Sequence, residues 1–477
     1  MAETLMDRAN EILERAIFAA AEFQQFDQER TDKVVEAVYR VALNARIKLA
    51  KMAVDETGIG IWEDKVWKNV IGTQLVYENI KAEKTVGVIN HDAITGISEI
   101  AQPLGPIFAV TPVTNPTSTA IYKILICLKT RNPIIISAHR NAAKCTGEAA
   151  RICYEAALAA GAPEDCVQMI PAGSRDFTQT VMAHPGVALI LATGGTGLVK
   201  AAYSSGNPAI GVGPGNVPVF IDESADFPFA VTSILTSKTF DNGTVCASEQ
   251  SVIVEDKIAK EVRDEFVRQN CYFLTPEEIR KVEKIAIIKD SMSMSPLIVG
   301  QSVQTIAERA GISVPPGTRI LLAELGGVGK DHPLSVEILA PILAFYTAKD
   351  YHSAIKLCID LNYLGGIGHS AGIYANDEKR ILEFSQLINA GRIVVNTPTS
   401  QGAVGGTFNM LPPSLTLGCG TGGKNITTEN ITVKHLINIQ RVCRRKMNDR
   451  FFSIDRNKYL DENCDETDLR LEYHKNH

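Results

Sequence analysis

The chain has 477 residues, and its 48 lysines and arginines against 54 aspartates and glutamates give a formal net charge of −6. Hydrophobic residues make up 45% and charged residues 21%, the balance of a folded globular protein, and the length predicts two to three domains. No long block carries one sign of charge and no apolar run approaches the roughly 18 residues of a membrane helix. The sequence therefore predicts neither a nucleic-acid partner nor a membrane span.

The first 54 residues have a helical pattern. From about residue 7, apolar side chains recur every three or four positions with few helix breakers, which predicts a set of amphipathic helices. The first fifteen residues are acidic at helical spacing rather than basic and then apolar, so we expect no export signal. No two of the ten cysteines have the CxxC spacing, which predicts reduced thiols in the cytoplasm and no zinc site.

Residues 84–102 contain two short alternating runs around the turn-rich pair His91-Asp92, which is the pattern of a β-hairpin. A hairpin that stands apart from a main sheet is suited to contacts between subunits. We therefore expect an oligomerisation arm in a homodimer or homotetramer.

Between residues 105 and 222, short apolar runs alternate with helical stretches. Strands are expected at 106–110, 134–137, 167–170, 187–192 and 218–221. This alternation predicts a parallel, doubly wound, Rossmann-like sheet, in which ligands bind at the carboxyl ends of the strands.

A second alternating region follows, with strands expected at 251–254, 320–323, 342–346, 371–374 and 393–396. The fold class is therefore α/β, with a cleft between a cofactor-binding domain over 1–239 and a catalytic domain over 240–415. Residues 416–440 are expected to return to the cofactor and oligomerisation region, and the charged residues 441–477 to form a solvated extension.

Three glycine-rich segments could be ligand loops or plain turns. Thr193-Gly-Gly-Thr-Gly follows an expected strand and precedes a helix, where backbone amides can meet a cofactor phosphate. Gly211-Val-Gly-Pro-Gly-Asn has the wrong spacing for a dinucleotide fingerprint, and Gly326-Gly-Val-Gly-Lys330 continues with Asp331 and so fails as a P-loop.

Two polar segments could carry chemistry. Cys246 lies in Phe240-Asp-Asn-Gly-Thr-Val-Cys after a turn, although a single cysteine is more often a small buried hydrophobe than a nucleophile. Asn115 lies at a strand end before Pro116, where it could cap a helix or offer an amide N–H to an oxyanion.

In their order along the chain, these segments resemble the aldehyde dehydrogenase superfamily from about residue 5 to residue 442. Several longer motifs are similar to its CoA-acylating branch, which includes acetylating acetaldehyde dehydrogenases and the N-terminal half of bifunctional aldehyde-alcohol dehydrogenases. These motifs are Thr114-Asn-Pro-Thr-Ser-Thr-Ala, Leu191-Ala-Thr-Gly-Gly, Val199-Lys-Ala-Ala-Tyr-Ser-Ser-Gly, Phe240-Asp-Asn-Gly-Thr-Val-Cys-Ala-Ser-Glu-Gln-Ser and Leu415-Thr-Leu-Gly-Cys-Gly. The resemblance implies the aldehyde dehydrogenase fold, with a small β oligomerisation hairpin beside the two α/β domains.

The resemblance also implies roles for single residues. Cys246 takes the position of the catalytic nucleophile and Asn115 that of the oxyanion amide. Glu337 falls where the superfamily places a carboxylate on the nicotinamide ribose, and Thr193, Gly194 and Gly195 fall in the cofactor loop. His369, in Gly365-Gly-Ile-Gly-His-Ser, matches a motif of the acylating branch and is the histidine expected to help thiol exchange, or else a loop histidine bonded to backbone.

Two departures from the hydrolytic members of the superfamily matter. The glutamate that would activate water is replaced by Gly211, so a thioester should persist until a thiol such as coenzyme A attacks it. The second departure lies where the superfamily binds the adenosine part of the cofactor. His139 stands in place of the usual lysine there, and Ala142 stands in place of the usual acidic residue. NAD is the default cofactor of the branch, but Arg140 is suited to a 2′-phosphate, so NADP stays open.

The expected reaction is reversible oxidation of a short aldehyde to acyl-CoA through a thioester on Cys246, with acetaldehyde as the first choice. Propionaldehyde, sulfoacetaldehyde and succinate semialdehyde are the alternatives, and an anionic one would need a cation that Lys123 or Arg392 would have to supply. The candidate pocket residues are mostly neutral: Ile121, Thr244, Val245, Gln401 and Gly402.

An inactive assembly paralogue is a remote alternative, because nucleophile, oxyanion donor and cofactor contact are all present. No metal dependence is expected. Since the resemblance is to half of a bifunctional chain, ending at His477 leaves no room for an alcohol dehydrogenase, so we expect a separate alcohol dehydrogenase or aldehyde-producing partner.

Overall fold

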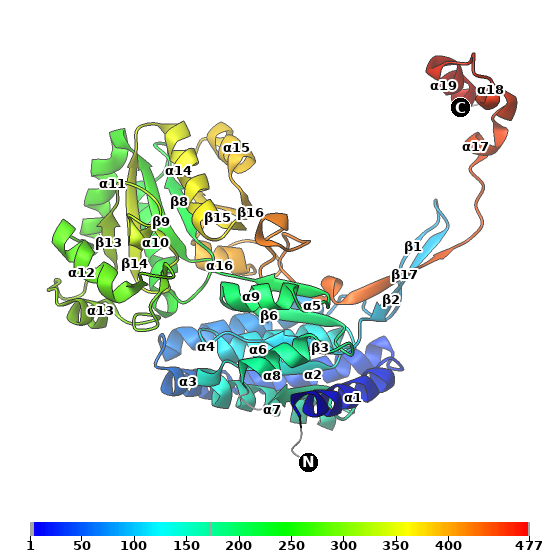
Figure 1. The fold of residues 1–477 in the computed structure, drawn as a ribbon, viewed down its shortest axis with the longest axis horizontal. Helices are drawn as coiled ribbons and strands as arrows, with labels where there is room; N and C mark the ends of the chain where they lie inside the picture. The colour runs from blue at the N-terminus through cyan, green and yellow to red at the C-terminus, as the bar shows by residue number, and fades with distance from the viewer. Residues whose placement is uncertain (1–3, 171–173, 476–477) are drawn as a thin grey trace.

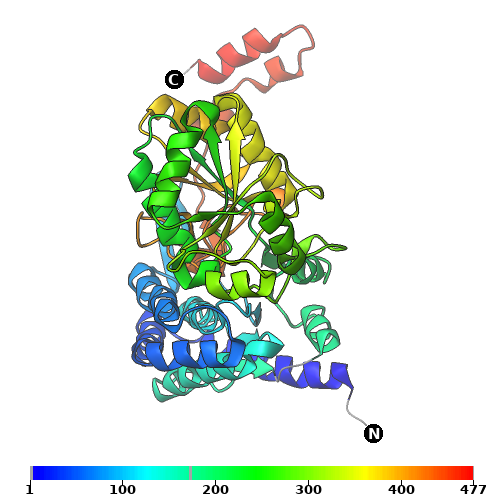
Figure 2. The same cartoon turned by 90° about the vertical axis from the view of Figure 1, so that its left-hand side faces the viewer.

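The structure is a computed structural model that describes residues 4–170 and 174–475. Figure 1 shows two α/β units stacked on one another, the first in blue to green and the second in green to orange, with a slender arm on one side. Figure 2, turned by 90°, shows the same stacking. No helix of residues 4–170 or 174–475 is long and apolar enough to cross a membrane.

The first unit begins with helices, as the apolar spacing predicts. Thr4 and Asp27 cap α1 and α2 by accepting the amides of Asp7 and Arg30, which satisfies helix N–H groups that otherwise have no partner. The helices are α1 (Leu5–Phe23), α2 (Gln28–Asn44), α3 (Arg46–Thr57), α4 (Trp62–Val70) and α5 (Val76–Ile80), with a π-helical turn over Ile71–Leu75.

The first sheet is parallel, with strand order β5-β4-β3-β6-β7. Its strands are β3 (Ile107–Val110), β4 (Ile134–Ser137), β5 (Val167–Ile170), β6 (Leu189–Thr193) and β7 (Ala209–Val212), and its crossover helices are α6 (Pro116–Lys129), α7 (Ala143–Ala159), α8 (Arg175–Met182) and α9 (Thr196–Tyr203). Helices α2, α6 and α7 pack on one face, and α1, α8 and α9 on the other. Because both faces are covered, β3 to β6 are apolar runs, which is why the sequence revealed them, whereas β7 was missed because Gly211 belongs to a glycine-rich segment.

The second sheet has seven strands in the order β10-β13-β14-β9-β8-β15-β16, all paired in parallel. They are β8 (Val217–Ile221), β9 (Glu249–Glu255), β10 (Tyr272–Phe273), β13 (Leu321–Glu324), β14 (Ile342–Ala348), β15 (Gly368–Tyr374) and β16 (Ala390–Val395). Its helices are α10 (Phe227–Thr239), α11 (Asp256–Arg268), α14 (Tyr351–Leu364), α15 (Glu378–Leu387) and α16 (Thr399–Val404). Helices α12 (Pro276–Ala286) and α13 (Val303–Ala310) and the ladder β11 (Ile287–Ile288) and β12 (Ser293–Met294) complete the unit.

The five strands expected between residues 251 and 396 all form in this sheet. The strand expected at 218–221 forms as well, but as β8 it pairs with β9 and β15 rather than with the first sheet. The chain therefore changes sheets between β7 and β8, earlier than the expected boundary at residue 240, because Val219 lies in register with Val252 and Gly372.

The expected hairpin is present as β1 (Gly87–Asp92) and β2 (Ile97–Pro103), paired antiparallel. Strand β17 (Ile437–Cys443) adds to β2, so the last part of the chain completes a three-stranded arm. Beyond it the charged extension contains α17 (Asp449–Ser453), α18 (Arg456–Leu460) and α19 (Glu466–His474). Figure 1 shows these helices in red at the end of the arm, away from both sheets.

Candidate active site

A cavity of about 710 Å³ lies between the two units. Its walls include the carboxyl ends of β3, β4, β6 and β7, where a doubly wound sheet binds ligands. Eight of the nine predicted site residues line it, and His369 does not: the eight are Asn115, His139, Arg140, Thr193, Gly194, Gly195, Cys246 and Glu337.

Cys246 lies on the loop between α10 and β9, partly exposed at the cavity wall. A short 3-10 turn over Phe240–Gly243 leads into this loop. Burial, and then the nearby carboxylate of Glu337, raise the pKa of the Cys246 thiol to about 12, and the guanidinium of Arg392 opposes them. The thiol is therefore protonated at neutral pH in the ligand-free cavity.

Asn115 stands at the N-cap position of α6, and Pro116 is the first helical residue. The side chain of Asn115 makes no cap hydrogen bond. Instead its Oδ1 accepts from the Nζ of Lys68 at 2.6 Å, and its Nδ2 donates to the Oγ1 of Thr114 at 3.1 Å. The amide is thus free of the capping role that its position suggests.

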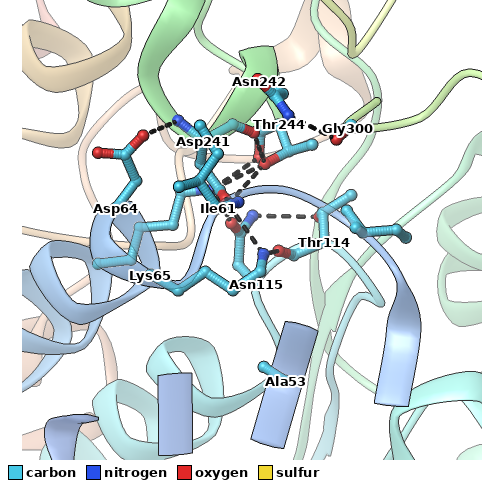
Figure 3. Close-up of polar contacts among 12 residues, drawn as sticks. Ala53, Ile61, Asp64, Lys65, Thr114, Asn115, Asp241, Asn242, Thr244 and Gly300 are labelled. Carbon is cyan, nitrogen blue, oxygen red and sulfur yellow. Dashed lines mark hydrogen bonds and ion pairs between the residues drawn. The ribbon is translucent and has the colours of Figure 1, made fainter. Parts of the chain in front are cut away.

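Next to Asn115 lies a buried ionic group that the sequence analysis missed, called here the Lys68 cluster; Figure 3 labels its members Asp64, Lys65, Asp241 and Thr244. The cluster comprises Asp64, Lys65, Lys68, Asp241 and Thr244. Asp241 is fully buried and accepts from the Nζ of Lys65 at 2.8 Å and of Lys68 at 2.5 Å. Two lysines three positions apart on one short helix were the available signal, because that spacing puts them on one face.

Both lysines of the Lys68 cluster form ion pairs with the one carboxylate of Asp241. Burial opposes ionisation of Asp241, but the two ammonium groups outweigh it and hold the pKa of that carboxyl below its ordinary value. Burial lowers the pKa of Lys68 to about 8, although the Asp241 carboxylate favours its charged form. Asp64 accepts the backbone amide of Asp241 at 2.8 Å.

The loop after β6 offers a binding site for phosphate. Gly195 is the N-cap of α9 and makes no side-chain cap, so the amides of the first turn of α9 face the cavity that Gly194, Gly195 and Gly197 line. A Cβ built on Gly195 or on Gly197 meets no atom within 4 Å, so this stretch of wall borders open space. A helix N-terminus with unoccupied amides suits an anionic group such as a pyrophosphate.

Glu337 is the only carboxylate among the described residues that line the cavity. Its Oε1 accepts from the amide of Gly215 at 2.9 Å. Burial raises the pKa of Glu337 to about 7, and the Gly215 hydrogen bond partly opposes this.

Two arginines and a histidine line the β4 end of the cavity. His139 and Arg140 follow β4 directly, and Arg175 of α8, which the sequence analysis missed, joins them. The Nδ1 of His139 accepts the amide of Asn141 at 3.2 Å, and burial, with Arg140 beside it, lowers the pKa of this imidazole.

Gly211 lies in β7 with no room for a side chain. Its backbone carbonyl and amide both bond to the hydroxyl of Tyr203 from α9. The space into which a side chain of residue 211 would extend is filled by Val199 and Tyr203 of α9.

His369 is the second residue of β15 and is fully buried behind the cavity wall. Its Nδ1 lies 3.1 Å from the Oγ of Ser370, and burial lowers the pKa of the imidazole to about 3. A Cβ built on Gly215 would lie 2.3 Å from the Cys246 carbonyl oxygen and 3.0 Å from the His369 Nδ1. Gly215 therefore separates the imidazole from the backbone of Cys246.

The five residues expected to form the substrate pocket fall into two groups. Val245 and Gln401 line the cavity, whereas Ile121, Thr244 and Gly402 do not. Lys123, on α6, is buried against the first sheet, where it donates to the carbonyls of Val110 and Leu191. Arg392 is buried as well and donates to backbone carbonyls such as that of Gly418, so neither cation reaches the cavity.

No group of His, Cys, Asp and Glu side chains within the described ranges is arranged to hold a metal ion. The cavity thus presents a thiol, an amide, one carboxylate, a helix N-terminus and a set of cations.

Comparisons with known proteins agree with this arrangement. The profile described as "Aldehyde dehydrogenase family" matches residues 2–409. The chain is 48% identical over 452 residues to the bifunctional aldehyde-alcohol dehydrogenase AdhE of Escherichia coli strain K12, covering 94% of this chain and 50% of that protein. The chain thus spans about half the length of that relative.

Two further relatives are matched over nearly their whole length. The chain is 35% identical to the succinate-semialdehyde dehydrogenase (acetylating) of Clostridium kluyveri, covering 91% of this chain and 94% of that protein. Its sequence is 48% identical to that of an acetylating aldehyde dehydrogenase from Geobacillus thermoglucosidasius with a known crystal structure. The two structures match with a TM-score of 0.90, covering 93% of this chain and 98% of that one.

Proposed function

The chain belongs to the aldehyde dehydrogenase family, and from that premise we propose that it catalyses the reversible, CoA-acylating oxidation of a short aldehyde. One observation carries the proposal: the thiol of Cys246 and the amide of Asn115 line one cavity, while position 211 carries no carboxylate. A nucleophile and an oxyanion donor without a dedicated base for water favour transfer of the acyl group to another thiol.

In the first step the Cys246 thiol gives up its proton to solvent and its sulfur attacks the aldehyde carbonyl carbon, so that a C–S bond forms and the carbonyl electrons move onto oxygen. The Asn115 Nδ2 and the Cys246 backbone amide donate to that oxyanion, as donors do in acyl transfer. When bound, the nicotinamide cofactor supplies the acceptor of the hydride that leaves the carbon.

In the second step the thioester on Cys246 meets the thiolate of coenzyme A. The new C–S bond forms as the bond to the Cys246 sulfur breaks, so Cys246 leaves as a thiolate and acyl-CoA is released. His369 is our proposed base for the incoming thiol. Burial lowers its pKa to about 3, so in the ligand-free structure the imidazole is neutral but only weakly basic.

The cavity residues fit a nicotinamide dinucleotide. The amides that follow Thr193, Gly194 and Gly195 would hold the pyrophosphate, and Glu337 would accept from the nicotinamide ribose hydroxyls. NAD remains our first choice. Because Arg140 and Arg175 stand at the β4 end of the cavity, we propose that a 2′-phosphate is accepted there too, so that NADP also serves.

The lack of an unpaired cation near Cys246 bears on which aldehyde is preferred. Around Cys246 the wall is largely apolar, with Phe240, Val245 and Leu339, and the nearby ammonium of Lys68 is already paired. An anionic tail would be desolvated there without a partner, which costs several kcal/mol. We therefore place acetaldehyde first and uncharged propionaldehyde second, ahead of sulfoacetaldehyde and succinate semialdehyde.

The partners follow from the same proposal. The three-stranded arm offers the exposed strand β17 for contact with a second copy in a homodimer or homotetramer. All ten cysteines are free thiols, which is consistent with the reducing cytoplasm. A separate alcohol dehydrogenase or aldehyde-producing enzyme would exchange the aldehyde.

The test is NADH and NADPH formation with the four aldehydes, with and without coenzyme A, in the wild type and in Cys246→Ser. We expect multiple turnover with acetaldehyde only when coenzyme A is present, and none in Cys246→Ser. Steady CoA-independent production of free acid, or full activity in Cys246→Ser, would overturn the proposal.

A further inference from the structure

The ammonium of Lys68 is held by acceptors from two different parts of the chain. It donates to the Asn115 Oδ1 at 2.6 Å, to the Asp241 Oδ2 at 2.5 Å and to the Thr244 Oγ1 at 2.9 Å. Lys68 and Asn115 belong to the first unit, whereas Asp241 and Thr244 precede Cys246 in the second. Lys68 is 3% exposed, so water cannot replace these partners freely.

This contact decides which end of the Asn115 amide faces the ammonium. A lysine ammonium has three donors and no acceptor, so only the amide oxygen of Asn115 can face it. The Nδ2 must then point the other way, where one N–H bonds to Thr114 Oγ1 and the second has no partner within the described ranges. A side chain at position 68 able to accept would allow the amide to flip.

The same cluster holds the turn that leads to Cys246. Asp241, Asn242 and Gly243 have φ values of 51°, 52° and 76°, a left-handed stretch that costs a non-glycine residue about 1 kcal/mol or more. Figure 3 shows the Asp241 carboxylate at the centre of the contacts that hold it. Its Oδ1 accepts the Ile61 amide at 2.7 Å, and Asn242 donates to the Gly300 carbonyl at 2.9 Å.

We propose that Lys68 is a positioning residue of the oxyanion site, which orients the Asn115 amide toward the cavity and ties it, through Asp241, to the turn that leads to Cys246. The inference rests on the proposed function, because it assumes that Asn115 binds the oxyanion. Lys68 touches no reacting atom in this scheme, since its donors are taken by Asn115, Asp241 and Thr244.

A double-mutant cycle tests this role. The readout is the rate constant of the first NADH turnover in single-turnover experiments, together with the KM for the aldehyde. We expect Asn115→Ala to slow that turnover about 100- to 1000-fold and Lys68→Met about 10- to 100-fold, with little change in KM. Lys68→Met combined with Asn115→Ala should be no slower than Asn115→Ala alone, because the amide that Lys68 orients is gone.

Two variants serve as controls. Lys68→Arg keeps a donor-only side chain and should restore most of the rate. Lys65→Met removes the other ammonium from Asp241 but leaves the Lys68 contact with Asn115, so its effect should combine additively with that of Asn115→Ala. If Lys68→Met unfolds, Lys68→Gln gives the same test, because a glutamine amide accepts as well as donates.

The outcomes separate the two proposals. Wild-type turnover in Asn115→Ala would refute the oxyanion assignment in the proposed function. A slow Asn115→Ala with a wild-type rate in Lys68→Met, or with additive losses in the double variant, would leave that assignment intact and refute the positioning role of Lys68.

Discussion

The hydroxyl of Tyr203 donates a hydrogen bond to the carbonyl of Gly211 at 2.9 Å and accepts one from its amide at 3.1 Å. A Cβ on residue 211 would lie 2.7 Å from the Val199 Cγ1 and 3.1 Å from the tyrosine ring. Helix α9 thus occupies the space into which a side chain of residue 211 would extend. A carboxylate there would require α9 to move.

This packing predicts the behaviour of the enzyme without coenzyme A. With no carboxylate at position 211 to activate water, we expect acetaldehyde and NAD to yield a burst of about one NADH per subunit and then almost no turnover. Rapid-mixing absorbance and mass spectrometry of an acetylated Cys246 measure this. Continued NADH release at a rate similar to that with coenzyme A would contradict it.

The second prediction concerns the charge next to the thiol. Above pH 7 Glu337 is ionised, and its negative charge raises the pKa of Cys246. Glu337→Gln removes that charge, so the Cys246 thiol should have a lower pKa and react several-fold faster with iodoacetamide at pH 8. Below pH 7 the carboxyl is protonated in the wild type, and the difference should shrink.

Site-resolved mass spectrometry of ligand-free protein gives the alkylation rate of Cys246 alone. Glu283→Gln, which neutralises a carboxyl that does not line the cavity, is the matched control. An alkylation rate in Glu337→Gln equal to or below that of the wild type at pH 8 would refute the electrostatic coupling.

The third prediction concerns cofactor choice. An Arg140 guanidinium near a 2′-phosphate would form charge-assisted hydrogen bonds worth about 1.5–3 kcal/mol, or about tenfold or more in binding. We expect Arg140→Ala to raise the KM for NADP by at least about tenfold and to change that for NAD little. Lys144→Ala removes a nearby exposed charge that does not line the cavity and should change neither KM. Equal effects of Arg140→Ala on both cofactors would exclude recognition of the 2′-phosphate.

The fourth prediction concerns His369. Since burial lowers its pKa to about 3, the imidazole stays neutral from pH 5 to 9, so any contribution of His369 should not change with pH over that range. We expect His369→Ala to slow acyl transfer to coenzyme A at least about tenfold while leaving the NADH burst unchanged. Quenched-flow measurement of acetyl-CoA formation separates the two steps, and His184→Ala serves as the control. Unchanged transfer would assign His369 a structural role only.

Much of the fold could be predicted because its causes are local. The strand at 134–137 is four buried residues in a row, since helices cover both faces of the first sheet. The hairpin at 84–102 was visible from alternation around a turn. Which sheet a strand joins was not visible: β8 has the same apolar character as the strands before it, and its partners β9 and β15 come later in the chain.

The candidate site was predictable only in part. Long motifs indicated Cys246, Asn115 and the glycine loop, and all three line the cavity. Lys68 carried no comparable signal, because a lysine on a short helix is usually solvated. Its burial depends on Asp241, which is 173 residues away in the chain.

By itself, then, the sequence determined the α/β elements, their order and the chemical groups available, since these depend on neighbours a few residues apart. The tertiary structure alone decided which groups meet. It buried Lys123 and Arg392 away from the cavity, put His369 behind Gly215, and turned the Asn115 amide away from capping by giving it an ammonium partner. The physical reason is that a buried charge or imidazole must find its partners across the fold, and the distances between such partners are set by packing rather than by spacing along the chain.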